Sequence, residues 1–448
     1  MDLFGIRRLP FFVRRNYYYE VRHILFWSLF TGLVEGQFGS IIVSRTFGGS
    51  EFLIAVASAT PFAASVVSLV WGMLCVGRAK IRLMMMFGSG AVLCAAGIGA
   101  IPNSPAGAVW FIAQIAAAQV LLSGVVTTRS AIWRSNYPVA VRGSIAARLQ
   151  RVRAVLSVLS VQVAAIICDG DGDAYRYVFP VGAAFGACGI VLLGKLRVRR
   201  ERAEMGRIRV ASLPGDSREG AVERFGFVAL LSPGHVLGEM FRVLRDDGRF
   251  ARYCVAQFFH GLANLMTLPV VVAVVTRELP SGWRFGYWIS TVLLVALPML
   301  MLLGSLAWWG RLFDRIGVLR FRVVNIYVWC AGLLFGLLGT VVLVGGRGDL
   351  AGYYVLAIFF FVCRGLLYGI AQGGGKIAWN LGHLHFAGAE QAEIYMGVHV
   401  FLTGIRGLVA PLCGMWLWTV IGWPVWGVAM GFGLLSLALY RRLAREES

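Results

Sequence analysis

Twelve apolar runs, each close to the length that crosses a bilayer, constrain this chain more than any other feature. A membrane-spanning helix needs about 20 mainly apolar residues. The runs cover residues 24–43, 52–77, 83–101, 108–128, 149–168, 177–194, 253–275, 287–309, 323–344, 351–372, 394–421 and 423–440. They are continuously apolar rather than alternating, which favours helices over a barrel. We therefore expect an all-α polytopic membrane protein with twelve transmembrane helices.

Composition agrees with this class and argues against a nucleic-acid partner. Only 14% of the residues are charged, whereas a soluble domain carries about 25%. The net charge of +20 resides in short basic tracts between the apolar runs, and no soluble basic face with base-reading side chains emerges. We expect the lipid bilayer, and no nucleic acid, as the surroundings of the chain.

The basic residues also predict the topology. With the N-terminus inside, the inner segments hold 35 Lys and Arg residues and the outer loops hold 5. Basic residues concentrate on the cytoplasmic side of membrane proteins. Both termini are therefore expected in the cytoplasm, in a multi-pass protein of a cell membrane, with the bacterial cytoplasmic membrane as the expected location.

The longest non-apolar segment, 195–252, divides the chain into a first six-helix half (1–194) and a second (253–448). Its later part places Val236, Met240, Val243 and Leu244 at helical spacing among charged residues. This pattern predicts an amphipathic helix lying along the inner membrane surface.

A loop signature after the eighth span carries a family resemblance. Gly310, Asp314, Arg315, Gly317 and Arg320 stand in the order G-x-x-x-D-R-x-G-x-x-R. Together with two halves of six spans, this segment resembles the major facilitator superfamily. The matching segment after the second span keeps its glycine and basic residues, but Val76 replaces the aspartate. Two further patches, 364–369 and 407–414, resemble superfamily motifs that usually lie in the first half.

The resemblance implies a mechanism and a gate. The two halves are expected to rock around a mid-membrane site lined by spans one, four, seven and ten. The loop signature implies that Asp314 holds a cytoplasmic gate by binding Arg315, Arg320 or a neighbouring helix N-terminus, with Gly310 and Gly317 shaping the loop.

Apart from Arg151 and Arg153 at the start of the fifth run, three charged residues lie within the spans as predicted: Glu35, Arg364 and Arg406. A charge at the bilayer centre costs about 2.5–3.5 kcal/mol on insertion scales. Glu35, the only acid among them, is the expected proton carrier, because a poorly hydrated carboxyl can exchange a proton near neutral pH. In this hypothesis deprotonated Glu35 balances Arg364 until an anionic substrate takes its place. The alternative is a buried pair that only locks two helices.

Three polar stripes at helical spacing are the candidate substrate contacts. They are Gln257, His260 and Asn264 in span seven, Arg364, Tyr368 and Gln372 in span ten, and His399, Thr403 and Arg406 in span eleven. Hydrogen-bonding side chains on one face of an apolar helix suit a polar ligand. Bonding between helices, without any ligand, is the alternative for each stripe.

We therefore expect a monomeric secondary active transporter that moves a small polar solute by alternating access, coupled to protons. The arginines favour an anionic solute. The alternative is a transporter-like receptor, scaffold or lipid- or pigment-handling partner without solute flux. Neither an enzyme, a cofactor nor a metal site is expected, because no catalytic or metal-ligand set converges.

Overall fold

The structure is a computed structural model that describes residues 9–75, 78–199, 201, 233–279, 286–345, 351–387 and 392–447. Within these ranges every regular element is a helix and none is a strand. The expected all-α class is confirmed.

Helices α1 to α7 form the first half. Their bounds are α1 Phe11–Val34, α2 Phe38–Arg45, α3 Glu51–Leu74, α4 Lys80–Gly97, α5 Pro105–Asn136, α6 Val139–Gly170 and α7 Tyr175–Leu193, with a 3-10 turn at Ile98–Ala100. Local signals explain some of these bounds. The Ser104 hydroxyl caps α5 by accepting a hydrogen bond from the Gly107 N–H at 3.1 Å. Pro105, at the first position of the helix, is a second start signal.

The second half follows the long central segment. Its elements are α10 Pro233–Asp246, α11 Gly248–Leu265, α12 Thr267–Arg277, α13 Gly286–Thr291, the π-helical turn Val292–Ala296, α14 Leu297–Gly345, α15 Ala351–Leu381, the 3-10 turn Gly382–His385, α16 Ala392–Ile421 and α17 Val425–Arg445. The predicted amphipathic helix corresponds to α10. Gly317, with φ 70° and ψ 172°, interrupts α14, which is therefore two helices that meet at this residue.

By length and composition, nine described helices could cross a membrane, or ten when the bent pair α1 and α2 counts as one span. One of the nine, Gly286–Gly345, is 60 residues long and contains the break at Gly317. Helix α17 matches the last predicted span but is not among the nine. Starting from ten, dividing the long segment at Gly317 and adding α17 would give twelve. Since these two steps go beyond length and composition, the number twelve stays a prediction.

Two helices begin ten or more residues earlier than the apolar runs predicted. Helix α1 starts at Phe11 rather than at 24, and α6 starts at Val139 rather than at 149. A hydropathy window ends at the first charges, whereas a helix continues while its charges find partners. Glu20 illustrates this, because its carboxylate is buried and accepts the Trp133 indole N–H at 2.8 and 2.9 Å. The sequence predicted Glu35 as the only acid within the membrane spans. Because α1 begins at Phe11, Glu20 lies in the same helix, and that prediction is wrong.

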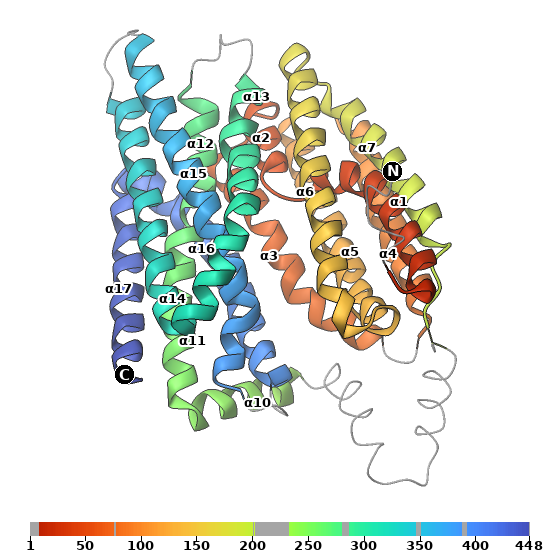
Figure 1. The fold of residues 1–448 in the computed structure, drawn as a ribbon. Coiled ribbons are helices and arrows are strands. Elements are labelled where there is room, and N and C mark those ends of the chain that lie inside the picture. The colour runs from red at the N-terminus through yellow and green to blue at the C-terminus, as the bar shows by residue number, and fades with distance from the viewer. Residues whose placement is uncertain are drawn as a thin grey trace.

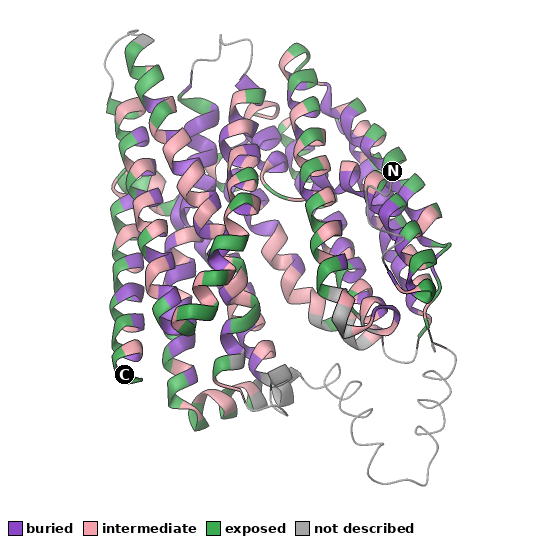
Figure 2. Cartoon of the chain, viewed as in Figure 1, coloured by how far each residue is buried: buried purple, intermediate pink, exposed green. Residues whose placement is uncertain are grey.

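The helices run roughly side by side in two groups, red to yellow-green for the first half and green to blue for the second (Figure 1). Buried residues face the interior of each group, and exposed residues line the outside (Figure 2). Many exposed side chains are large and apolar, such as Leu93, Trp110 and Trp416. Such a surface suits contact with lipid, where exposed apolar groups carry no cost.

The apolar cores show how the halves meet. One core contains residues of both halves, including Ile42 and Phe111 from the first and Val272 and Trp426 from the second. It lies at the end that carries the loops after α2 and α12, which the predicted topology places outside; we call it the outer end. Towards the opposite, inner end, separate cores belong to one half each.

Candidate functional site

The first membrane helix is broken at Glu35, Gly36 and Gln37. Glu35 ends α1 in an extended conformation, its N–H bonding to the Thr31 carbonyl at 2.8 Å. Gly36 has φ +83°, a value that disfavours any other residue, and α2 continues at an angle of 41°. A broken membrane helix leaves backbone groups unpaired and is a recurrent place for binding sites in transporters.

Glu35 forms an ion pair with Arg153 of α6 at this break. The two side chains are 37% and 21% exposed, so the pair is accessible rather than sealed in the core. Arg364, the partner predicted for Glu35 from the sequence, does not form this pair, so in this conformation the predicted pairing is wrong. Arg153 lies at the start of the predicted run 149–168, and because α6 begins at Val139 it is well inside that helix, where Glu35 at the facing break can reach it.

A third charge faces this pair from the second half. Lys376 of α15 is exposed and interacts electrostatically with both Glu35 and Arg153. It extends the predicted stripe by one further step of four residues beyond Arg364, Tyr368 and Gln372, and such positions share one helix face. The Lys376 end of this stripe is therefore directed towards the first half.

Arg364 itself points elsewhere. It is 4% exposed, and its guanidinium carbon lies 5.0 Å from the ring centre of Tyr368 and 5.7 Å from that of Trp426 in α17. These are cation–π contacts. Arg364 is held inside the second half by aromatic rings, without a carboxylate partner among the described residues.

Three buried polar atoms without hydrogen-bond partners belong to residues on or next to the break: the Thr31 hydroxyl and the side-chain oxygens of Gln37 and Gln119. Gln119 of α5 also donates its amide N–H to the Val34 carbonyl at 2.9 Å. Buried polar atoms are usually paired, so unpaired ones need an explanation. Gln37 was not among the residues predicted for the site, although a Glu-Gly-Gln run inside an apolar helix is a signal for a break.

The stripe in span seven lies inside the second half. The Gln257 amide oxygen accepts from the Tyr440 hydroxyl at 2.9 Å, and the His260 ring is 5.5 Å from that of Trp329. Asn264 and Trp329 both line a small hollow, and this hollow has no room for a water molecule. The expectation that this stripe faces the central cavity therefore lacks support in this conformation. Helical spacing shows that residues share a face, but not which neighbour the face meets.

The stripe in α16 connects that helix to α11. His399 is buried 5.6 Å from the ring of Trp379, and Thr403 donates to its carbonyl at 2.8 Å. Arg406 donates to the Gln257 carbonyl. These residues belong to the interior of the second half together with the span-seven stripe.

The loop signature lies at the break in α14. Asp314, Arg315, Gly317 and Arg320 are exposed, and none of the three charged residues forms an ion pair within the described part of the chain. The gating role of Asp314 and Gly310 stays a prediction. Val76, where the first-half signature departs from its pattern, lies outside the described residues.

The halves are joined at the outer end by polar contacts. Asp169 at the end of α6 accepts the N–H groups of Tyr287 and Trp288 at 2.7 and 2.9 Å, at the start of α13. The hydroxyls of Ser44 and Thr276 are 2.6 Å apart. Further contacts at this end join Thr46 to Tyr287, Arg45 to Ser290, and Arg277 to Glu51 and the Gly49 carbonyl. The described contacts thus hold the outer end closed.

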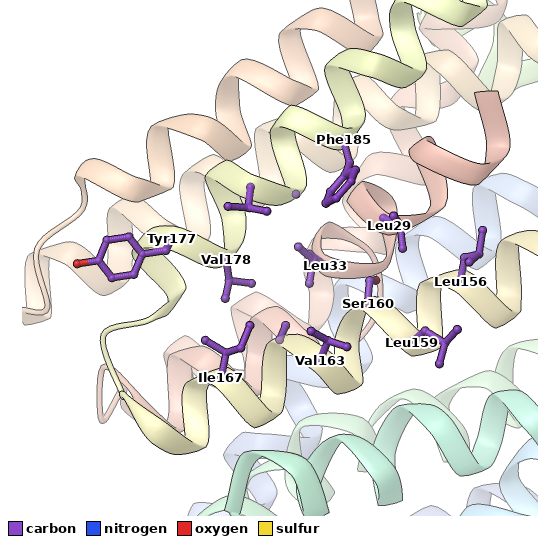
Figure 3. Close-up of a pocket in the computed structure, with 13 residues that line it drawn as sticks. Leu29, Leu33, Leu156, Leu159, Ser160, Val163, Ile167, Tyr177, Val178 and Phe185 are labelled. Carbon is purple, nitrogen blue, oxygen red and sulfur yellow. The ribbon is translucent and has the colours of Figure 1, made fainter. Parts of the chain in front are cut away.

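A pocket of about 370 Å³ lies between α1, α6 and α7 (Figure 3). Its lining is apolar, with side chains such as Leu33, Val163 and Phe185, and the Ser160 hydroxyl is its one side-chain polar group apart from that of Tyr177. In Figure 3 the ring of Tyr177 extends away from the pocket. This pocket suits an acyl chain rather than a polar solute.

Comparison with known proteins identifies the fold. No protein-family model matches the chain, and no curated protein matches its sequence. Among solved structures, a mutant of the nucleoside transporter NupG superposes with a TM-score of 0.66 at 12% identity, covering 95% of this chain and 98% of its own. The fold is that of the major facilitator-type transporters.

Two other structures of this fold agree. The inward-open xylose transporter XylE from E. coli has a TM-score of 0.63 at 11% identity, covering 94% of each chain. A peptide transporter, POT, in complex with sulfate has a TM-score of 0.62 at 15% identity, covering 98% of this chain and 96% of its own. The resemblance expected from the loop signature is confirmed at the level of the major facilitator-like fold.

Cysteine labelling tests which stripe faces water in this fold. In a chain whose eight native cysteines are replaced, Lys376→Cys and Gln372→Cys should react readily with a hydrophilic thiol reagent. His260→Cys and Asn264→Cys should react at least about tenfold more slowly, because their faces are packed against Trp329. Equal labelling at all four positions would show that α11 also lines an aqueous path.

Proposed function

We propose that this chain is a secondary active transporter that moves a small polar, anionic solute by alternating access, coupled to protons. The observation that carries this proposal is the charge arrangement at the helix break. Glu35 and Arg153 pair in the first half, and Lys376 faces them from the second half without an ion-pair partner among the described residues. One cation is thus left over, at an accessible position between the halves.

The spare cation favours an anion as the transported solute. An anionic group between Arg153 and Lys376 would bind cations from both halves at once, which is what a central site must do in this fold. The unpaired oxygens of Thr31, Gln37 and Gln119 can accept hydrogen bonds from hydroxyl or amide groups of the same solute. Tyr368 and Gln372 extend the polar lining on α15.

The pair also supports a coupling mechanism. A bound anion would compete with Glu35 for Arg153, and a carboxylate that exchanges its cationic partner for a neighbouring anion binds a proton more readily. Proton and anion would then bind together, which is symport. For a cationic solute the same acid would exchange a proton for the solute, which is antiport.

Solute flux into proteoliposomes tests the proposal. Counterflow screened over small organic and inorganic anions, with sugars and nucleosides as neutral comparators, should identify an exchanged anion. Lys376→Gln should reduce that exchange by about tenfold or more, because one ionic contact to an anion contributes on the order of 1.5–3 kcal/mol. Arg311→Gln, which removes an equal charge from an exposed position in α14, should leave it unchanged.

Failure of every solute class to exchange would contradict the proposal. It would favour the alternative of a transporter-like receptor or scaffold. Exchange restricted to neutral sugars and unaffected by Lys376→Gln would retain a transporter but reject the anionic site.

A further inference from the structure

The apolar pocket of Figure 3 is a groove with α1 at its floor. Helices α6 and α7 both pack closely against α1 but make few contacts with each other. Glycines allow these close approaches. A Cβ atom at Gly32 of α1 would lie 2.7 Å from the Ser157 carbonyl oxygen of α6, and one at Gly182 of α7 would lie 2.5 Å from the Leu33 side chain. Because α6 and α7 stay apart, a space of about 370 Å³ remains between them.

The groove is continuous with the surface of the protein that suits contact with lipid. Apolar side chains that are each between 48% and 67% exposed form its rim: Leu159, Val163 and Ile167 on α6, and Tyr177 and Val181 on α7. Buried Leu33, Ala164 and Val178 form its floor. A hydrocarbon chain can therefore enter sideways from the bilayer without leaving apolar surroundings.

The length of the groove matches one leaflet of a bilayer. Along α6 it extends from Leu156 to Ile167, and these 11 positions correspond to about 16 Å of helix. The hydrocarbon core of a bilayer is about 30 Å thick, so that one leaflet contributes about 15 Å. Tyr177, near the start of α7, marks the outer end of the groove, and tyrosine is typical of the membrane–water interface. The groove thus leads from the outer interface towards the bilayer centre.

The lining suits hydrocarbon and not water. The Ser160 hydroxyl already donates to the Ser157 carbonyl at 2.9 Å, and the Tyr177 ring extends away from the groove (Figure 3). A trapped water molecule needs 2–4 polar partners, which this lining does not supply. An empty space would deprive the surrounding side chains of van der Waals contacts. An acyl chain restores those contacts.

We propose that this groove binds one acyl chain of a phospholipid from the outer leaflet. The open rim leaves the second chain in the bilayer and the headgroup at the outer interface. A free fatty acid fits less well, because none of the residues that line the groove is cationic and could hold its carboxylate. The recognised chemistry is therefore the chain itself, at the depth of one leaflet.

The bound chain would contact both helices that carry the ion pair at the helix break. Glu35 follows Leu33 by two positions in the chain, and Arg153 precedes Leu156 by three. A chain packed between α1 and α6 would favour the arrangement in which Glu35 meets Arg153. The lipid site is independent of the identity and charge of the solute, because it lies within the first half alone.

Photolabelling in proteoliposomes tests this site. Two phosphatidylcholine probes carry a diazirine on one acyl chain, either near the glycerol or near the methyl end. The first should label Ile167 and the second Leu156, which is the order of depth that an outer-leaflet lipid requires. After transfer to excess detergent, labelling of buried Leu33 should persist, whereas labelling of Leu93 on the open apolar surface should be lost.

Two tryptophan variants of α6 supply a matched comparison. Val163→Trp should lower the labelling of Leu33 at least about fivefold, because an indole at the rim occupies the space that the chain needs. Val155→Trp places the same ring at a position that is 49% exposed but does not line the groove, and it should be labelled like the parent. Excess unlabelled phosphatidylcholine should compete with the probe, and free palmitate should not.

Equal loss of label from Leu33 and Leu93 in detergent would overturn the proposal, because bulk lipid behaves in that way. Undiminished labelling of Leu33 in Val163→Trp would reject the groove as the place of binding. The reverse order of depth would indicate an inner-leaflet lipid, and competition by palmitate a fatty-acid site; either result contradicts the assignment. If Val163→Trp does not fold, the depth order and the detergent comparison in the parent protein decide.

Discussion

Glu35→Gln should abolish accumulation of the solute against its gradient while sparing exchange of solute for solute. A pH difference of one unit holds about 1.4 kcal/mol per proton, sufficient for about tenfold accumulation by one-to-one symport. Glutamine keeps the size and the hydrogen-bonding oxygen of the side chain but cannot carry the proton. In proteoliposomes with an imposed pH gradient, the ratio of internal to external solute should be about 10 for the parent protein and about 1 for Glu35→Gln.

Two variants separate coupling from structural support. Glu446→Gln, at the inner end of α17, removes an acid far from the break and should keep the accumulation ratio. The double change Glu35→Gln with Arg153→Gln removes both partners of the ion pair, so it leaves no unpaired charge at the break and should still lack coupling. Accumulation driven by pH in the Glu35→Gln protein would show that the proton is carried elsewhere, with buried Glu20 as the next acid to examine.

A disulfide between Ser44→Cys and Thr276→Cys should stop transport completely and reversibly. The two hydroxyl oxygens are 2.6 Å apart across the halves, so sulfur atoms in their places are close to the length of about 2.05 Å for a disulfide bond. Alternating access requires these helices to separate at the outer end, and the bond would prevent it. Flux should fall to background after oxidation and return to its starting value after reduction.

Each single cysteine variant, oxidised in the same way, should transport normally, which excludes damage by the oxidant. Mass spectrometry should confirm that the cross-link has formed. Full transport by a completely cross-linked protein would mean that the outer ends of α2 and α12 do not separate during the cycle. The contacts between Asp169 and α13 would then be static supports and not a gate.

Sequence reasoning located the residues of the site better than their partners. Glu35 does lie at the helix break, and Lys376, one step beyond the α15 stripe, faces it, whereas Arg364 of that stripe is held among aromatic rings. The loop signature does mark a break in α14. Arg153 lay at the start of the predicted run 149–168 and was counted with the basic residues of the inner side, so it was not considered as a partner of Glu35. The stripe of Gln257, His260 and Asn264 was recognised as one face, yet that face meets α14 and α17.

The sequence by itself determined that this chain is an all-helical membrane protein with the major facilitator fold. Length and apolarity of a segment are local properties, and in a bilayer each segment must satisfy its own backbone hydrogen bonds. Only the tertiary structure decided which charges meet, because the rotation of each helix about its axis depends on packing against its neighbours. For that reason Glu35 pairs with Arg153 and not with Arg364.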